Sequence, residues 1–256
     1  MMSERPTLYC ERGGDDGPSL VLLHGQSCNG GVWDGLLPLL AEHWPGRWLV
    51  PDLRGHGRSG HGAPYGIGVY AADVAGLLTP GEEVCLIGHS MGGAVAVALA
   101  TGLFGVPVRA AVVFGIKVDW SEEDRAGAAA VAQKPARLFE AREQAVERCL
   151  RVAGVHGLLG LDSRFADAGV VEVDGQFRLA TDPLVNAMGN YDLPAVARAA
   201  RAPIHLLTGE HDAMSTPEMM RKLGGEVTVL PGLGHNLHVE APEAFWRAIE
   251  SYLQAS

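Results

Sequence analysis

Short, continuous apolar runs recur along the chain and alternate with segments of helical periodicity. Six such runs lie at residues 19–23, 47–50, 84–87, 110–114, 204–207 and 227–230. Runs this short, without polar alternation, are typical of strands buried on both faces. Strands that alternate with helices form a mostly parallel sheet covered on both sides. The sequence therefore predicts an α/β fold built on a doubly wound, mostly parallel sheet.

The predicted helices occupy the intervals between these strands. They are expected at residues 32–42, 69–78, 94–104, 217–223 and 242–253. The last of them carries Phe245, Trp246 and Ile249 on one face, which is the pattern of an amphipathic helix. A further strand is expected at 7–12, before a glycine-rich turn at 13–17, and we expect it to pair antiparallel at the edge of the sheet.

The alternation stops between residues 117 and 192, a segment rich in Ala, Arg and Glu. A helix is expected at 135–152 and a polar hairpin at 171–179, where Asp174-Gly175 is a strong turn signal. A stretch this long between two strands is not an ordinary loop. We therefore expect an insertion at 117–192 that folds over the sheet, and a core made of residues 1–116 and 193–256.

The charge balance excludes several kinds of partner. The net charge of the 256 residues is −10, and no basic run is present, so nucleic acid and anionic membranes are not expected partners. Residues 1–10 lack the apolar core of a signal peptide. The uncharged stretch 84–108 is interrupted by glycines and His89, which favours a strand and a buried helix over a membrane span. A cytoplasmic location is the expectation.

The four cysteines predict neither a zinc site nor a disulfide scaffold. Their positions, 10, 28, 85 and 149, fit no zinc spacing and are few for a disulfide-rich protein. Cys85 lies in an apolar run and is expected to be a small buried hydrophobe. Cys28 follows a glycine turn and is a candidate for the edge of a pocket.

The pentapeptide Gly88-His89-Ser90-Met91-Gly92 matches the pattern G-x-S-x-G. It follows a predicted strand and precedes a predicted helix, as this nucleophile motif requires. A sharp turn there holds the serine hydroxyl at the carboxyl edge of the sheet, near a helix N-terminus that favours developing negative charge. The alternative is a glycine-rich packing turn, because so short a pattern also arises without function.

A nucleophilic serine needs a histidine base and a carboxylate that orients this base. In sheets of this kind the chain order is serine, acid, histidine. Asp212 follows the strand at 204–207 and His235 follows the strand at 227–230. Because parallel strands end at the same edge, Ser90, Asp212 and His235 are predicted to meet there.

Other residues compete for these roles. Asp119 and Glu210 also follow strands and are alternative acids. His211 is expected to be a loop residue, and His238 to lie past the turn that carries His235, with Glu240 helping to start the last helix. His24 is expected to be a buried turn residue bonded to backbone rather than a base.

Two backbone N–H groups are expected to form the oxyanion hole. Met91, directly after the serine, supplies one of them. The loop after the strand at 19–23 supplies the other, and Gln26 is the best candidate in it. Only the backbone is used here, so the side chains are free to vary.

In combination, these motifs resemble the α/β-hydrolase fold family, in its esterase, thioesterase and C–C hydrolase branch. The residues that carry the resemblance are His24-Gly25, Pro51-Asp52-Leu53-Arg54-Gly55-His56-Gly57-Arg58-Ser59, Gly88-His89-Ser90-Met91-Gly92-Gly93, Gly209-Glu210-His211-Asp212, Gly234-His235 and Glu240-Ala241-Pro242. They span nearly the whole chain outside the insertion. The resemblance implies that the insertion is a helical cap. Dehalogenases and epoxide hydrolases of this fold carry Asp as nucleophile, and Ser90 argues against both.

Two further motifs are weak. Residues 55–60 match G-x-G-x-x-G, but His61-Gly62-Ala63-Pro64 follows where a dinucleotide fingerprint needs a helix. Residues 235–238 lack the helix and third ligand of a zinc site, and no P-loop ending is present. Neither a cofactor nor a metal is expected.

The sequence thus predicts a serine hydrolase that acts on a small to medium carboxylic ester or thioester, a small-molecule acyl substrate. C–C bond or lactone hydrolysis, lyase or perhydrolase chemistry, and ligand binding remain as alternatives on the same fold. Trp120, Leu138, Phe139 and Leu158 are candidates for the substrate pocket, although the interior of the cap is the favoured interpretation. Arg137, Arg142, Arg164 and Arg178 are candidates to meet an acidic substrate, with solvated charge favoured for each.

Overall fold

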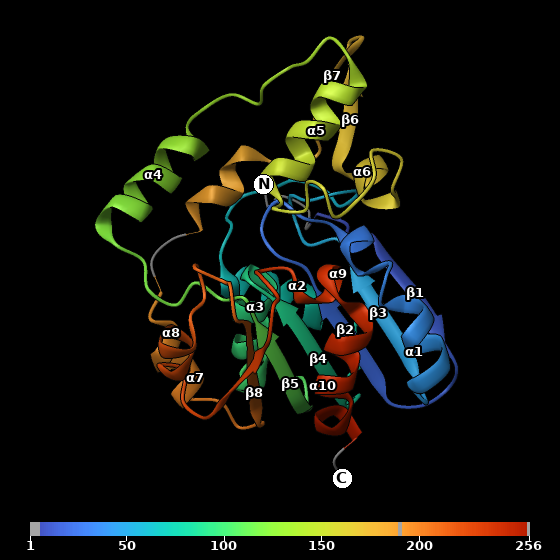
Figure 1. The fold of residues 1–256 in the computed structure, drawn as a ribbon, viewed down its shortest axis with the longest axis vertical. Helices are drawn as coiled ribbons and strands as arrows, with labels where there is room; N and C mark the ends of the chain where they lie inside the picture. The colour runs from blue at the N-terminus through green and yellow to red at the C-terminus, as the bar shows by residue number, and fades with distance from the viewer. Residues whose placement is uncertain (1–5, 189–190, 255–256) are drawn as a thin grey trace.

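The main sheet has seven strands in the order β1-β3-β2-β4-β5-β8-β9 (Figure 1). The strands are β1 (Cys10–Gly14), β2 (Ser19–Leu23), β3 (Arg47–Pro51), β4 (Val84–His89), β5 (Val108–Phe114), β8 (Ile204–Gly209) and β9 (Val227–Leu230). Strand β1 is antiparallel to β3, and all other pairs are parallel. The predicted fold class is confirmed, and each of the six apolar runs lies in a strand.

The structure is a computed structural model and describes residues 6–188 and 191–254. Half of the N-terminal segment that was considered for a signal peptide therefore lies outside the described residues. The predicted antiparallel edge strand is confirmed with a shift in its bounds. It begins at Cys10 and continues through Gly13 and Gly14, which pair with Trp48 and Arg47 of β3. The expected turn is therefore shorter, because backbone pairing extends into its first two glycines.

Helices cover both faces of the sheet (Figure 1). Those of the core are α1 (Leu37–His43), α2 (Ile67–Ala75), α3 (Met91–Ala100), α7 (Leu193–Arg198), α8 (Pro217–Arg221), α9 (Leu237–Glu240) and α10 (Pro242–Gln254), with a 3-10 turn η1 (Gly30–Trp33). Alternate residues of a strand point to opposite faces. Val21 of β2 accordingly packs in the cluster that contains α2 and α3, whereas its neighbour Leu22 packs in the cluster that contains α1 and α10.

Several core helices have different bounds from those predicted: α2 lies at 67–75 rather than 69–78, α8 ends at Arg221 rather than Leu223, and two others differ more. The segment predicted as one helix at 32–42 is divided into η1 and α1. The reason is that Asn29 caps η1 through the N–H of Gly31, while Pro38 occupies the first turn of α1, where its missing N–H costs nothing. The helix predicted at 94–104 begins earlier, at Met91, and ends at Ala100, so it starts directly after Ser90.

The chain between β5 and α7 forms a separate layer over the carboxyl ends of the parallel strands (Figure 1). Its elements are α4 (Glu122–Ala132), α5 (Arg142–Val152), α6 (Arg164–Gly169), β6 (Val170–Val173), β7 (Gln176–Leu179) and η2 (Pro183–Ala187). The predicted hairpin is confirmed, with Asp174 and Gly175 in its turn. The helix predicted at 135–152 begins only at Arg142, because Phe139 exchanges two backbone hydrogen bonds of 2.8 Å with Phe177.

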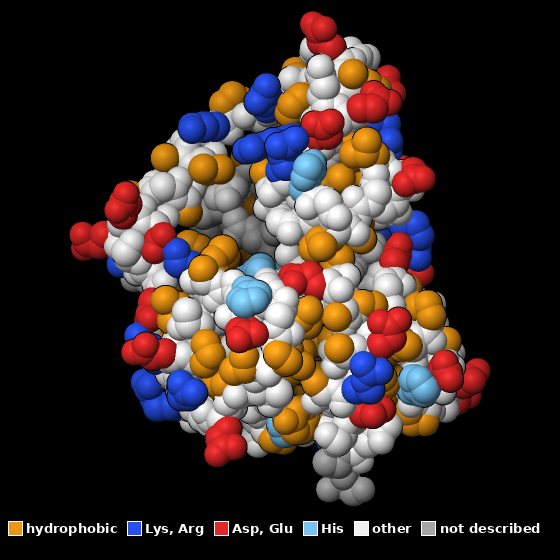
Figure 2. Space-filling view, viewed as in Figure 1, with side chains coloured by type: hydrophobic (Ala, Val, Ile, Leu, Met, Phe, Trp, Pro, Cys, Tyr) orange, Lys and Arg blue, Asp and Glu red, His pale blue; other side chains and the backbone are white. Residues whose placement is uncertain are grey.

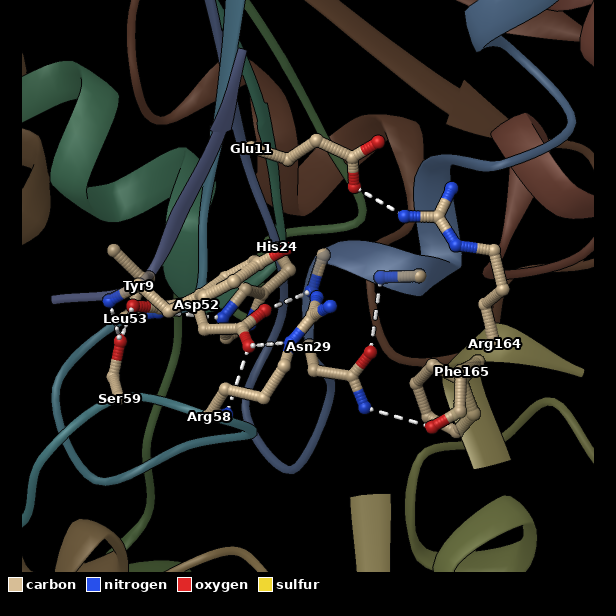
Figure 3. A network of polar contacts seen from close by, with 12 residues as sticks. Tyr9, Glu11, His24, Asn29, Asp52, Leu53, Arg58, Ser59, Arg164 and Phe165 are labelled. Carbon is tan, nitrogen blue, oxygen red and sulfur yellow. Dashed lines mark hydrogen bonds and ion pairs between the residues drawn. The ribbon is translucent and has the colours of Figure 1, made fainter. Parts of the chain in front are cut away.

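Polar contacts join this layer to the core (Figure 3). The guanidinium of Arg164 pairs with the carboxylates of Glu11 and Asp34. The side-chain amide of Asn29 donates to the carbonyl oxygen of Phe165 at 2.9 Å, while its oxygen caps η1. Phe165 is fully buried in the apolar cluster that includes α1 and α10. The start of α6 is therefore held to the core by both apolar and polar contacts.

No helix within residues 6–188 and 191–254 is both long and apolar enough to span a bilayer.

Candidate active site

Ser90 lies in the sharp turn between β4 and α3. Its φ of 52° and ψ of −115° are unusual for a residue with a side chain. Such a conformation costs about 1–3 kcal/mol and persists only where neighbouring structure holds it. Here the N–H of Ser90 donates to Phe114 at the end of β5, and the N–H of Ala94 donates to the carbonyl of Ser90. The strained turn places a half-buried serine at the carboxyl end of β4.

The two glycines of the pentapeptide are required by close backbone contacts. A Cβ on Gly92 would lie 2.2 Å from the carbonyl oxygen of Leu23 in β2. A Cβ on Gly88 would lie 2.5 Å from the carbonyl oxygen of Gly92. A larger residue at Gly92 would push the turn away from β2, and a larger residue at Gly88 would push the start of α3 away from β4. The spacing of small residues therefore reflects how tightly β4 turns into α3.

His235 and Asp212 are in direct contact. Nδ1 of His235 lies 2.8 Å from Oδ2 of Asp212, whose side chain is 2% exposed. The other carboxylate oxygen of Asp212 accepts the N–H groups of Met214 at 2.9 Å and Ser215 at 3.1 Å. These two bonds fix the carboxylate, so it presents one oxygen to the imidazole. A buried acceptor at Nδ1 keeps the proton there and leaves Nε2 free to accept one.

The loop that carries His235 is held on both sides of the histidine. The carboxylate of Glu240 accepts the N–H of Gly234 at 2.6 Å and that of Asn236 at 2.8 Å. Nε2 of His89 lies 3.1 Å from the carbonyl oxygen of His235. The expectation that Glu240 starts the last helix is wrong, because its carboxylate is used by this loop. Neither Glu240 nor His89 had been assigned to the site, although both lie within motifs that carry the family resemblance.

The competing acids have other partners. The carboxylate of Asp119 lies 2.7 Å from the ammonium of Lys222, and both side chains are about half exposed. Glu210 accepts the N–H of Gly232 at 2.8 Å. Within the described part of the chain, Asp212 is thus the only candidate acid in contact with His235.

The competing histidines are placed differently from His235. Nδ1 of His24 lies 2.8 Å from the carbonyl oxygen of Gly25, and its Nε2 accepts the N–H of Leu53 at 2.8 Å. His24 is therefore a buried turn residue, as expected from the sequence. His211 is exposed. His238 lies in α9 and is fully buried, with its ring 4.3 Å from that of Trp33.

We expect the buried histidines to lower the free energy of unfolding in weak acid. Burial lowers the pKa of His238 to about 3, with a further lowering by His235, and burial lowers the pKa of His24, His56 and His89 as well. Below pH 6.5 the unfolded chain binds protons that the folded chain does not, so the free energy of unfolding falls as pH decreases. We expect His238→Phe to reduce this pH slope by up to about 1.4 kcal/mol per pH unit.

Urea unfolding of wild type and His238→Phe at several values between pH 5 and 8 measures this slope. The difference between the two proteins should be constant above pH 7 and should change steadily below pH 6.5. Parallel curves over the whole range would mean that His238 is protonated equally in the folded and unfolded chain.

The two residues predicted to supply the oxyanion hole, Met91 and Gln26, both lie close to Ser90. Met91 is the first residue of α3, where N–H groups have no acceptor within the helix. Gln26 lies in the loop after β2 and lines the same cavity as Ser90. The side chain of Gln26 also has a partner, since its amide donates to Oδ1 of Asn186 at 2.6 Å. This link to the layer above the sheet was not foreseen from the sequence.

Asp52, at the end of β3, holds the loop that contains Gln26 (Figure 3). Its fully buried carboxylate accepts the N–H of Gly30 at 2.6 Å and the N–H and Nε–H of Arg58 at 2.8 and 3.0 Å. The G-x-G-x-x-G segment at 55–60 is therefore a loop folded around this carboxylate. No helix begins there, and α2 starts only at Ile67.

A cavity of about 690 Å³ lies between the carboxyl edge of the sheet and the layer above it. On the core side it is lined by Ser90, His235 and the loop that contains Gln26. Trp120 and Phe139 line it from the opposite side, so the expectation that both belong to the interior of that layer is incomplete. Leu138 and Leu158 are 49% and 45% exposed and do not line the cavity. They belong neither to the pocket nor to the interior of the layer above the sheet, the two places considered for them from the sequence.

Cys28 also lines this cavity, as its position after a glycine turn suggested. Its side chain is nevertheless 2% exposed, and burial raises the pKa of the thiol to about 12. The reactive form of cysteine is the thiolate, which is nearly absent at such a pKa. Cys28 is therefore a poor candidate for a nucleophile on this wall.

The sheet, the strained serine turn and the acid–histidine contact at one edge define the class of α/β hydrolases. The chain belongs to the alpha/beta hydrolase family, whose sequence profile matches residues 20–248. The mouse (Mus musculus) sn-1-specific diacylglycerol lipase ABHD11 is 28% identical over 252 residues, which cover 92% of this chain and 81% of that protein. The resemblance stated from the sequence is thereby confirmed.

Solved structures agree over nearly the full length. E-2-(acetamidomethylene)succinate hydrolase has a TM-score of 0.81 and 25% identity, and the match covers 98% of this chain and 97% of that one. A thioesterase domain from the curacin biosynthetic pathway has a TM-score of 0.79 and 21% identity with the same coverage. At that identity, the second likeness shows the fold alone.

Proposed function

We propose that this chain is a serine hydrolase that cleaves a small to medium carboxylic ester or thioester through an acyl-enzyme. The observation that carries the proposal is that Ser90 and His235 line one cavity while His235 contacts the buried carboxylate of Asp212. A nucleophile, a base and a group that orients the base are the components of acyl transfer. The relatives named as a lipase and a hydrolase support the same reaction class.

In the proposed reaction, Nε2 of His235 takes the hydroxyl proton of Ser90 as its oxygen attacks the acyl carbon. Asp212 stabilises the imidazolium and keeps the ring oriented through Nδ1. The N–H groups of Met91 and Gln26 bind the oxyanion of the tetrahedral intermediate. His235 then gives its proton to the leaving alcohol or thiol, and the acyl group remains on Ser90.

Water completes the proposed cycle. His235 removes a proton from a water molecule, and the resulting hydroxide attacks the acyl-enzyme carbonyl. The carboxylic acid leaves as Ser90 recovers its proton. Every proton transfer in this scheme uses a residue of the chain, so no cofactor or metal is required. Residues 117–192 are proposed to act as a cap, because they form the outer wall of the cavity.

Covalent labelling with a fluorophosphonate probe tests the nucleophile directly. We expect wild-type protein to gain one phosphonyl group, and peptide mass spectrometry to locate it on Ser90. Ser90→Ala should not be labelled. Labelling of another residue in the folded wild-type protein would assign the nucleophile elsewhere.

A further inference from the structure

The charged side chains that line the large cavity are of one sign. They are Lys117, Lys134, Arg137, Arg148 and Arg151, and no Asp or Glu among the described residues lines it. The chain as a whole has 20 Lys and Arg against 30 Asp and Glu. The positive charge of the cavity lining is therefore not explained by the overall composition, which is acidic. Figure 2 shows Lys and Arg side chains along the upper rim of the hollow.

Four of the five cations come from the α4–α5 part of the layer above the sheet, and Lys117 comes from the chain just after β5, the strand next to β4. Lys117 follows β5, Lys134 follows α4, Arg137 precedes α5, and Arg148 and Arg151 are on α5. Residues three apart on a helix lie on the same face, so both of these arginines face the cavity while Cys149 and Leu150 are buried. We call this set the cationic wall.

The cationic wall is only partly neutralised by acids of the protein. Lys117 pairs with Asp124 at 2.6 Å and Arg151 with Glu147 at 3.5 Å. The guanidinium of Arg137 lies over the ring of Phe139 at 4.8 Å. Lys134 and Arg148 form no ion pair with any described residue.

Two other arginines in residues 117–192 lie outside the cavity and pair with acids of the protein. Arg142 pairs with Asp167, and Arg164 pairs with Glu11 and Asp34. Neither lines the cavity. Of the four arginines considered from the sequence as contacts for an acidic substrate, Arg142 and Arg164 therefore form ion pairs within the protein instead. A third, Arg178, donates to the carbonyl of Leu179, and only Arg137 reaches the cavity.

We propose that the substrate of this site carries an anionic group, a carboxylate or a phosphate, which binds the cationic wall. The inference rests on the proposed function, because it specifies the substrate of the same site. Guanidinium groups bind both anions through paired N–H donors. A cleft of one charge also concentrates oppositely charged ligands. Because four of the five cations belong to the layer above the sheet while Ser90 belongs to the sheet edge, we expect a spacer between the anionic group and the reacting carbonyl.

The test compares three aryl esters of similar acyl length. They are 4-nitrophenyl hydrogen adipate, its uncharged counterpart 4-nitrophenyl methyl adipate, and 4-nitrophenyl 5-phosphonopentanoate. Release of 4-nitrophenol is measured for wild type, for the double variant Lys134→Gln/Arg148→Gln, and for Arg142→Gln. Arg142 lies on the same helix as Arg148 but outside the cavity, so it is the matched control.

We expect wild type to favour an anionic ester over the methyl ester by about tenfold in kcat/KM at low salt, as electrostatic attraction into a charged cleft predicts. High salt should reduce the preference. The double variant should lose most of this preference, expressed as the ratio of kcat/KM for the anionic and methyl esters, while Arg142→Gln should keep it. The better of the two anionic esters identifies the anion.

Equal kcat/KM for charged and uncharged esters in wild type would overturn this inference and leave the serine hydrolase in place. A full preference in the double variant would overturn it too, because the cations would then not be its cause. If no ester is cleaved and no fluorophosphonate label appears, the proposed function fails, and the inference fails with it.

Discussion

Replacing Ser90 with alanine is expected to lower kcat/KM for 4-nitrophenyl acetate by about 10⁴-fold or more. The reason is that Ser90 is proposed to form the acyl-enzyme, and the buried, protonated thiol of Cys28 on the same wall is a poor substitute for it. Loss of the nucleophile removes the covalent pathway and leaves only the oxyanion hole and binding to assist water. Steady-state release of 4-nitrophenol measures the effect.

The Ser90→Ala protein should remain folded. Alanine has to adopt the same φ of 52°, which serine already tolerates, and the backbone bonds to Phe114 and Ala94 do not involve the side chain. Ser251→Ala, an exposed serine on α10, is the control and should retain full activity. Activity within tenfold of wild type in a folded Ser90→Ala protein would contradict the proposed mechanism.

The sequence predicted the sheet well because its strands are buried on both faces. A continuous run such as residues 84–87 has no polar positions that would fit a surface helix, and in β4 every residue is buried. Parallel strands end at one edge, so the order of Ser90, Asp212 and His235 along the chain was enough to predict a common location. The contact of 2.8 Å between His235 and Asp212 agrees with that prediction.

The layer above the sheet was harder to predict, because its contacts are distant in sequence. Arg164 pairs with Glu11 and Asp34, and no local pattern indicates partners so far away. The helix α4 had a local signal, since Ser121 and Asp124 form a capping box, but the surrounding alanines carry no apolar periodicity. Arg148 looks like any exposed residue of an amphipathic helix. Only the fold shows that this face of α5 borders a cavity.

Replacing Asp212 with asparagine is expected to lower kcat/KM by about 10³- to 10⁴-fold with little loss of stability. The amide oxygen of asparagine can still accept the N–H groups of Met214 and Ser215, so the turn is preserved. Its NH₂ group then faces Nδ1 of His235, and the imidazole has to carry its proton on Nε2. A histidine in that tautomer cannot accept the proton of Ser90.

Asp119→Asn tests whether Asp119, the acid that follows β5, orients His235 in place of Asp212. The carboxylate of Asp119 is about half exposed and pairs with Lys222, so its loss should change activity by less than about twofold and stability by less than about 1 kcal/mol. Both variants are compared by kcat/KM on 4-nitrophenyl acetate and by urea unfolding. The opposite pattern, with Asp119→Asn inactive and Asp212→Asn active, would assign the orienting carboxylate to Asp119. In that case the contact between His235 and Asp212 would serve only to hold the loop.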